Sequence, residues 1–289
     1  MKDIIRGLAT VVLAVPLALV SITGPPAATG TGQGYTSLGY AGLGHHDGCQ
    51  QWMALTFDDG PSYYRTMTLR TLRGKHVPAT FFDVGLRVAA NPQFAAFETG
   101  EGHLVLNHSW SHPHLPALST EQVRPQVLRT EEALRQAGAP MPFKLLRPPY
   151  GDVNDAVKDE LASLGYQYVN WDVLAVDWDV ATTSDEIRDT IVRAFRPGLV
   201  ILMHDGPIDS AAGAADEVAL PQIIDQAQQS GYCFGLLNPV GQVACAELHA
   251  SDTDIPQVRN PVPYLPLGPN SGGQLPPDPY VVVDPGSQL

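Results

Sequence analysis

Two adjacent carboxylates, Asp58 and Asp59, end an apolar stretch and are followed directly by Gly60 and Pro61. Neighbouring side chains of a strand point to opposite faces, but at a strand end that enters a turn both can reach one cleft. One aspartate can then hold a metal ion while the other takes a proton, as metal-assisted hydrolysis requires. Alone, such a run is more often a solvated hairpin turn, so the rest of the chain has to decide.

His108 and His112 lie four residues apart and form a second candidate site. On a helical turn this spacing places both imidazoles on one face, near enough to share a divalent cation. Pro113 limits any helix here to a single turn. Ser109 stands where the zinc proteases with an H-E-x-x-H motif have glutamate, which argues against that class. An aspartate of the first pair could be the third ligand of an open metal site.

Three further polar segments follow or lie between predicted strands. Arg147 precedes a sharp turn at residues 148–151; an arginine there can keep a carboxylate ionised, and the turn can offer an N–H group to an oxyanion. His204, followed by Asp205, ends an apolar strand and suits a general acid with a raised pKa. An acidic, aromatic stretch occupies residues 171–178. Barrel enzymes place their chemistry at such strand ends, so the combination favours an active site.

Short apolar runs alternate with amphipathic segments throughout this region. We expect strands at residues 52–57, 79–84, 104–106, 144–147, 166–171 and 199–203. We expect helices at residues 67–73, 120–137, 154–164, 184–194 and 219–229, the fourth of them capped by Ser184. Repeated strand-then-helix units favour a parallel sheet or a barrel.

The whole chain has 289 residues, enough for one large α/β domain or two small ones, and its 44% apolar residues are typical of a globular protein. The formal charge of −13 and the pI near 4.9 argue against a nucleic-acid partner, because binding phosphates needs a basic surface. A neutral or cationic partner fits better.

The N-terminus has the order of a secretory signal peptide, which we place at residues 1–28. Lys2 and Arg6 precede an apolar run at residues 8–22, and small residues and prolines follow. The run is short for a membrane span, and an uncleaved anchor is the alternative. The rest of the chain is expected to form a flexible linker (29–48), a compact domain (49–248) and a Pro- and Gly-rich tail, disordered or extended over the surface (249–289).

The chain has three cysteines, and an exported protein normally oxidises a pair of them. A bridge between Cys49 and Cys245 would tie together the two ends of the predicted domain. The alternatives are a bridge between Cys233 and Cys245, or three buried thiols.

The chain contains five motifs in the order TFDDGP, HSWSH, RPPYG, the 171–178 segment and LMHD. These motifs and their order resemble those of the polysaccharide deacetylases with a NodB homology domain, carbohydrate esterase family 4. The resemblance covers about residues 49–248. It implies a single-domain α/β fold, a distorted (β/α) barrel with the site at one rim. One departure is Leu174, where the family often has an aspartate three residues before the one matched by Asp177.

The resemblance also implies roles for individual residues. A divalent metal, expected to be zinc with cobalt(II) or another ion as the alternative, would be held by Asp59, His108 and His112. Catalysis would depend on Asp58 as general base, Arg147 as its charge partner, His204 as general acid and Asp177 as the residue that orients and tunes that histidine. The acetyl group would meet the backbone N–H of Tyr150 and a pocket formed by Trp171 and Leu202.

We therefore expect a secreted or cell-wall-associated hydrolase that removes N-acetyl groups from N-acetylglucosamine polymers, namely chitin, chitooligosaccharides or peptidoglycan. An acetylxylan esterase of the same family is the close alternative, because the motifs do not separate an amide from an ester. A catalytically silent carbohydrate-binding barrel would lack the base, a ligand or the acid, and all of these are present. A structural metal domain would need a fourth protein ligand. We expect no nucleic-acid partner, no membrane span in the mature chain, and a monomer.

Overall fold

The computed structural model describes residues 49, 51–205, 212–246, 248 and 253–259. The predicted signal peptide and linker, residues 1–28 and 29–48, lie outside this part of the chain. The strands are β1 (Gln51–Gly60), β2 (Thr80–Asp83), β3 (Leu104–Asn107), β4 (Leu145–Leu146), β5 (Gln167–Tyr168), β6 (Val173–Leu174), β7 (Val200–His204), β8 (Tyr232–Leu237) and β9 (Val243–Ala244). The helices are α1 (Arg65–Lys75), α2 (Gly85–Ala90), α3 (Gln93–Glu101), α4 (Thr120–Gln136), α5 (Asp155–Ser163), α6 (Ser184–Arg193) and α7 (Ala212–Gln229), with 3-10 turns η1 (Leu115–Ala117) and η2 (Pro149–Gly151).

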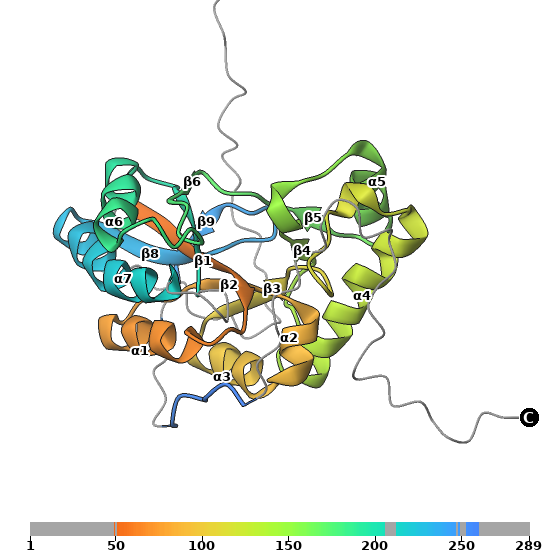
Figure 1. Cartoon of the computed structure of the whole chain (residues 1–289), viewed down its shortest axis with the longest axis horizontal. Coiled ribbons are helices and arrows are strands. Elements are labelled where there is room, and N and C mark those ends of the chain that lie inside the picture. Colours follow the sequence, from red (N-terminus) through yellow and green to blue (C-terminus); the bar gives the residue numbers. More distant parts are fainter. Residues whose placement is uncertain (1–48, 50, 206–211, 247, 249–252, 260–289) are drawn as a thin grey trace, which may run out of the picture. The chain divides into compact units, whose positions relative to one another are not determined.

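The strands form one sheet in the order β5-β4-β3-β2-β1-β7-β6, with β8 paired to β1 and β9 paired to β8. The pairs are parallel except β8 with β9. Helices surround the curved sheet in Figure 1, as expected for parallel strands whose crossovers lie on the outer face. The predicted α/β barrel-type fold is therefore what the chain adopts. The carboxyl ends of β1, β2, β3, β4 and β7 lie at one rim.

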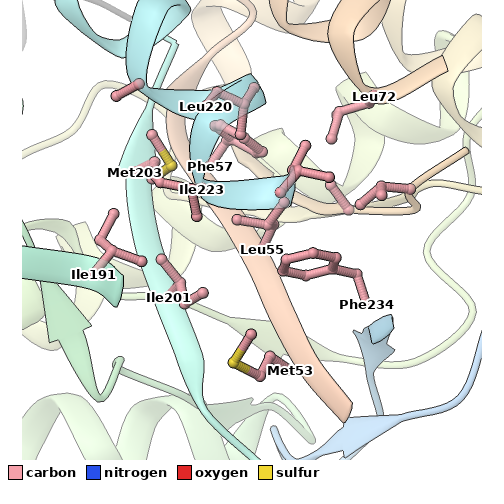
Figure 2. Packing of buried hydrophobic residues seen from close by; sticks show 14 of the residues in the cluster. Met53, Leu55, Phe57, Leu72, Ile191, Ile201, Met203, Leu220, Ile223 and Phe234 are labelled. Carbon is pink, nitrogen blue, oxygen red and sulfur yellow. The ribbon is translucent and has the colours of Figure 1, made fainter. Parts of the chain in front are cut away.

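The largest hydrophobic cluster lies between the sheet and the helices that cover β1 and β7. Alternate residues of β1 enter it, because successive side chains of a strand point to opposite faces. Figure 2 shows these side chains with those of the neighbouring elements: Met53, Leu55, Phe57, Ile201, Met203, Leu220, Ile223 and Phe234. The opposite face of β1 carries Ala54, Thr56 and Asp58. The hydrophobic alternation therefore sets the phase of β1 and directs Asp58 away from this cluster.

Two local expectations need correction. Helix α6 is capped by Thr183 rather than Ser184: the Thr183 hydroxyl accepts from the Glu186 N–H, and the Glu186 side chain accepts from the Thr183 N–H. The T-x-x-E spacing of a capping box selects Thr183, since glutamate then stands at the third helical position. In addition, α2 and α3 fill the connection between β2 and β3, where the apolar pattern alone predicts no helix.

The disulfide joins Cys49 to Cys233, so neither predicted pair, Cys49 with Cys245 or Cys233 with Cys245, forms. The register explains the pairing. Trp52 of β1 lies opposite Cys233 of β8, which brings the start of β1 beside the start of β8. Cys245 is a free, partly exposed thiol just after β9.

Residues 253–259 of the predicted tail lie along the helices of the domain. The Thr66 hydroxyl donates to the Pro256 carbonyl, and the Arg259 N–H donates to Asn91 Oδ1. Ile255 and Val258 pack against the largest hydrophobic cluster. This part of the tail therefore contributes to the packing, while the domain boundaries themselves stay a prediction.

Arg65 of α1 is fully buried and contacts three carboxylates, from β2, from α3 and from the residue that follows β7. Its Nη2 lies 2.7 Å from Asp83 Oδ1, its Nη1 lies 2.7 Å from Glu98 Oε1, and its Nε donates to Asp205. A Cβ on Gly60 would lie 1.5 Å from Arg65 Nη2, so the glycine that follows the two aspartates makes room for this cluster. Burial raises the pKa of Glu98 to about 8, although the Arg65 charge opposes the shift.

Arg65→Met is expected to lower the free energy of unfolding by about 3–5 kcal/mol, because it leaves buried carboxylates without their cation. Urea unfolding followed by circular dichroism measures the change. Arg135→Met is the matched control: Arg135 pairs with Glu132 on an exposed helix surface, where loss of an ion pair has little effect. Equal losses in the two variants would contradict a stabilising role for the buried cluster.

Candidate active site

Asp58 and Asp59 lie together at the carboxyl end of β1. Asp59 has φ 71°, and the β1–β2 register shifts between Asp58 and Gly60. This irregularity interrupts the strand alternation, so two consecutive side chains reach the same rim of the sheet. Asp58 is buried, and Asp59 is partly buried. The strand-end arrangement predicted for this pair is thus present.

The two histidines join Asp59 from the segment that follows β3. His112 Nε2 lies 3.0 Å and His108 Nε2 lies 3.3 Å from Asp59 Oδ1. The predicted helical turn is wrong, since residues 108–112 are not helical, and Ser109 and His112 have φ of 66° and 58°. The turn is held locally: the Ser109 N–H donates to Asn107 Oδ1, and the His112 N–H donates to Ser109 Oγ.

The donor set of Asp59, His108 and His112 fits a divalent metal ion. His108 Nδ1 lies 2.8 Å from the Arg147 carbonyl oxygen, so Nδ1 carries the donated proton and Nε2 of the neutral ring presents a lone pair. Asp59 Oδ1 is buried without a hydrogen-bond donor. His108 Nε2 and Asp59 Oδ1 are two acceptors that lie 3.3 Å apart, and a cation bound between them would stabilise both. Within the residues that the structure describes, this is the one group of three acidic or histidine side chains with such geometry.

Asp59 is ionised, as a metal ligand must be. Burial acts to raise the pKa of Asp59, but the positive charge of protonated His112 and hydrogen bonds from the two protonated histidines hold that pKa well below its usual value. A divalent cation in place of these protons would favour the carboxylate in the same way. An anionic oxygen therefore faces the two imidazoles.

Arg147 holds Asp58 from the side away from the three candidate ligands. Its Nη1 donates to Asp58 Oδ1 at 2.8 Å and to Thr56 Oγ1 at 2.7 Å, and its Nη2 donates to the Asn170 carbonyl at 3.0 Å. Burial lowers the pKa of Arg147, while the Asp58 charge opposes that shift, and an arginine remains a cation. Asp58 Oδ2 lies 3.7 Å from His108 Nε2. One oxygen of Asp58 is thus occupied, and the other faces the candidate metal site.

His204 lies on the strand next to Asp58, its register partner in the β1–β7 ladder. Asp177 accepts twice from this residue: Oδ1 lies 2.9 Å from His204 Nδ1, and Oδ2 lies 2.6 Å from the His204 backbone nitrogen. Burial lowers the pKa of His204, but the Asp177 charge and hydrogen bond raise it to about 10. His204 is therefore an imidazolium at neutral pH, with its ring oriented by Asp177.

Three candidate substrate-binding residues surround these groups. Tyr150 has φ 61° in η2, and its ring lies 4.6 Å from the His112 ring. Trp171 is partly buried and packs so closely on Gly151 that a Cβ there would lie 2.8 Å from the indole. Leu202 is buried two residues before His204 and therefore shares its face of β7. The structure thus brings all ten predicted site residues to one end of the sheet.

Thr56, the first residue of the TFDDGP motif, and Asn107 contribute to the site although the motif analysis gives neither of them a role. Thr56 orients Arg147, and Asn107 shapes the turn between the histidines while its Nδ2 donates to the Val127 carbonyl. The signal for Thr56 is its position two residues before Asp58, which puts both on one face of the strand. The signal for Asn107 is a buried amide at a strand end.

Comparison with known proteins was made by sequence and by structure. Residues 45–169 match the protein family described as polysaccharide deacetylase. The chain is 34% identical to a peptidoglycan-N-acetylglucosamine deacetylase of Bacillus cereus over 193 aligned residues. The alignment covers 66% of this chain and 69% of that protein. The chain is also 34% identical to a bifunctional xylanase/xylan deacetylase of Cellvibrio japonicus over 192 aligned residues. This alignment covers 66% of this chain and 28% of that protein.

A family 4 carbohydrate esterase from Streptomyces lividans, solved in complex with acetate, has a similar structure. The two share 36% sequence identity with a TM-score of 0.63, over 68% of this chain and 98% of that one. This likeness confirms the predicted distorted (β/α) barrel. The chain spans less than a third of the Cellvibrio japonicus protein, which carries a second activity.

Proposed function

The chain belongs to the polysaccharide deacetylases of carbohydrate esterase family 4, and from this premise we propose that it is a metal-dependent hydrolase that removes N-acetyl groups from N-acetylglucosamine polymers. One observation carries the proposal: Asp58, paired with Arg147, and His204, paired with Asp177, lie beside a three-residue candidate metal site. Such an arrangement provides a base and an acid around one electrophilic centre. A binding protein would have no use for both.

The metal would be held by Asp59, His108 and His112, and we propose zinc, with cobalt(II) as the alternative. A bound divalent ion polarises the acetyl carbonyl and makes water more acidic. The three protein ligands leave positions open, as catalytic zinc sites do and structural ones do not.

Asp58 is proposed to be the general base. Its Oδ2 accepts a proton from the attacking water, while Arg147, its charge partner, donates to Oδ1. The water oxygen adds to the acetyl carbon, and the Tyr150 N–H donates to the resulting oxyanion. Trp171 and Leu202 form the proposed apolar pocket for the acetyl methyl group.

His204 is proposed to be the general acid. As an imidazolium oriented by Asp177, it gives its proton to the departing sugar nitrogen as the carbon–nitrogen bond breaks. The products are acetate and a free amine on the polymer.

The likeness to a peptidoglycan-N-acetylglucosamine deacetylase supports an N-acetylglucosamine polymer as substrate. The formal charge of −13 fits a neutral polymer better than a polyanion. The candidates are chitin, chitooligosaccharides and peptidoglycan. Acetylxylan is the alternative, and the Cellvibrio japonicus xylan deacetylase favours it.

We also propose that the protein acts outside the cell or at the cell wall, as a monomer. The Cys49–Cys233 disulfide supports an oxidising compartment, as does the predicted signal peptide. Among the described residues, no helix has the length and apolarity needed to span a membrane.

Metal removal tests the proposed function. Purified protein should contain about one zinc or cobalt ion per chain, and a chelator should lower acetate release at least about tenfold, with recovery when the ion is returned. Acetate is measured with N-acetylated chitooligosaccharide, peptidoglycan and acetylxylan, and their relative rates assign the substrate. Absence of chelator-sensitive acetate from all three would sink the deacetylase proposal.

His112→Ala is the matched variant for this experiment. It should lose the metal and the activity together, whereas His76→Ala, at an exposed position after α1, should keep both. Wild-type metal content and chelator-sensitive activity in His112→Ala would mean that the metal is not bound at this cluster.

A further inference from the structure

Asp216 is a buried acid in α7 to which the mechanism above gives no role. Its side chain is 3% exposed, and both carboxylate oxygens are buried without a hydrogen-bond donor among the described residues. An ionised carboxylate in such surroundings is strongly destabilising. Since the structure offers no cation for it, Asp216 fits this position as a neutral carboxylic acid.

The surroundings of Asp216 are acidic. The carboxyl group of Asp177 is close enough to that of Asp216 for the two to share a hydrogen bond, and the charges of Asp177, Glu217 and Asp205 act on Asp216. The described cations nearest to Asp216 have other partners: Arg65 is bound to Asp205 and to the acids on β2 and α3, and His204 is bound to Asp177. Glu217 faces α1, where it accepts from the Thr68 hydroxyl. Among the described residues, no cation is thus bonded to Asp216 itself.

A hydrogen bond between two carboxyl groups requires a proton on one of them. Asp177 already accepts from both His204 Nδ1 and the His204 backbone N–H, so it serves as the anion of the pair. The proton therefore belongs to Asp216. Burial, followed by the charge of Asp177, raises the pKa of Asp216 to about 11, which agrees with this assignment.

We propose that Asp216 is a positioning residue that, as a neutral acid, donates a hydrogen bond to Asp177 and so completes a chain from α7 through Asp177 to His204. This inference rests on the proposed role of His204 as general acid. The donated bond holds the Asp177 carboxylate in the plane that suits His204, and it withdraws charge from Asp177. A less basic Asp177 raises the pKa of His204 less, so His204 gives up its proton more readily.

Two substitutions separate this role from simple packing. Asp216→Asn retains a neutral hydrogen-bond donor, so the pH profile of kcat/KM should match that of the wild type, with values within about twofold. Asp216→Ala removes the donor, so the basic limb of the profile should move to higher pH while kcat falls. Asp225→Asn, a partly exposed acid on the same helix, should change neither.

Two outcomes would overturn the proposal. A basic limb that moves to lower pH in Asp216→Asn would mean that Asp216 is an anion in the wild type, since its removal then takes a negative charge from His204. A profile of Asp216→Ala that superimposes on the wild type would mean that Asp216 does not act on His204.

The protonation of Asp216 can be tested without activity, from the pH dependence of unfolding. An acid that is neutral in the folded protein but ionised in the unfolded chain makes the folded state bind one more proton between about pH 4 and pH 11. The contribution of Asp216 to stability is therefore full below about pH 4 and is lost as pH rises towards 11. The folding equilibrium constant of the wild type should fall about tenfold more per pH unit than that of Asp216→Asn.

Urea unfolding of the wild type and Asp216→Asn at several pH values between about 6 and 9 measures this difference. Parallel pH dependences in the two proteins would overturn the assignment of a neutral Asp216. If the wild type releases no acetate from any substrate, the proposed function fails, but the unfolding experiment still decides the state of Asp216.

Discussion

Asp58→Asn is expected to lower acetate release by about 10²–10⁴-fold while the metal content stays at the wild-type level. The amide of asparagine has the shape of the carboxylate but does not accept the proton of the attacking water. Its oxygen can still accept from Arg147 Nη1, so the buried pair keeps one hydrogen bond. Acetate release and elemental analysis of the same preparation measure the two quantities.

Asp155→Asn is the control, because Asp155 is an exposed acid at the start of α5. It should leave both rate and metal content unchanged. If Asp58→Asn keeps a near-normal rate, the base is another group. If it loses the metal together with the activity, Asp58 acts as a ligand, and the distance of 3.7 Å from its Oδ2 to His108 Nε2 would have to shorten in the metal-bound protein.

His204→Gln is expected to lower acetate release from chitooligosaccharide by about 10²–10⁴-fold, because no charged donor then protonates the departing nitrogen. An aryl acetate ester needs no such proton, since a phenolate leaves readily. The same variant should therefore lose less than about tenfold on that ester. The ratio of the two losses isolates the proton that His204 supplies.

The pH profile provides a second test of His204. The active form of His204 is protonated: burial disfavours this proton, but Asp177 stabilises it and raises the pKa of His204 to about 10. Wild-type activity should therefore persist through neutral pH and fall as pH rises towards 10. Asp177→Asn should move this fall to lower pH. If His204→Gln loses the same fraction of its rate on chitooligosaccharide and on the aryl ester, the general-acid role is contradicted. The control is His76→Gln, at an exposed position after α1, which should change the rate on neither substrate.

The strand that carries the first motif was predictable from local sequence. Met53, Leu55 and Phe57 alternate with more polar positions, and this pattern alone puts Thr56 and Asp58 on one face. The two-histidine turn was predicted with the right residues and the wrong conformation. A spacing of four suits a helix, but it equally suits a turn with left-handed residues, and contacts made by Asn107 decide between them.

Other features depend on contacts that no local pattern records. The Cys49–Cys233 bridge follows from the pairing of β1 with β8, two strands whose cysteines are 184 positions apart. Asp216 looks like any acid in an amphipathic helix until α7 is packed beside Asp177. Local sequence therefore predicts which polar residues gather at the strand ends better than it predicts what holds them.

Four residues of the candidate site, Asp59, Ser109, His112 and Tyr150, have left-handed backbones with φ between 58° and 71°. A residue with a Cβ is less stable in this conformation by about 1–2 kcal/mol, so the site holds conformational energy that the surrounding fold must balance. Selection for heat resistance alone would therefore favour glycine or asparagine at Ser109 and Tyr150, which relaxes the backbone. The activity lost in such thermostable descendants would show how much of the rate depends on keeping these turns strained.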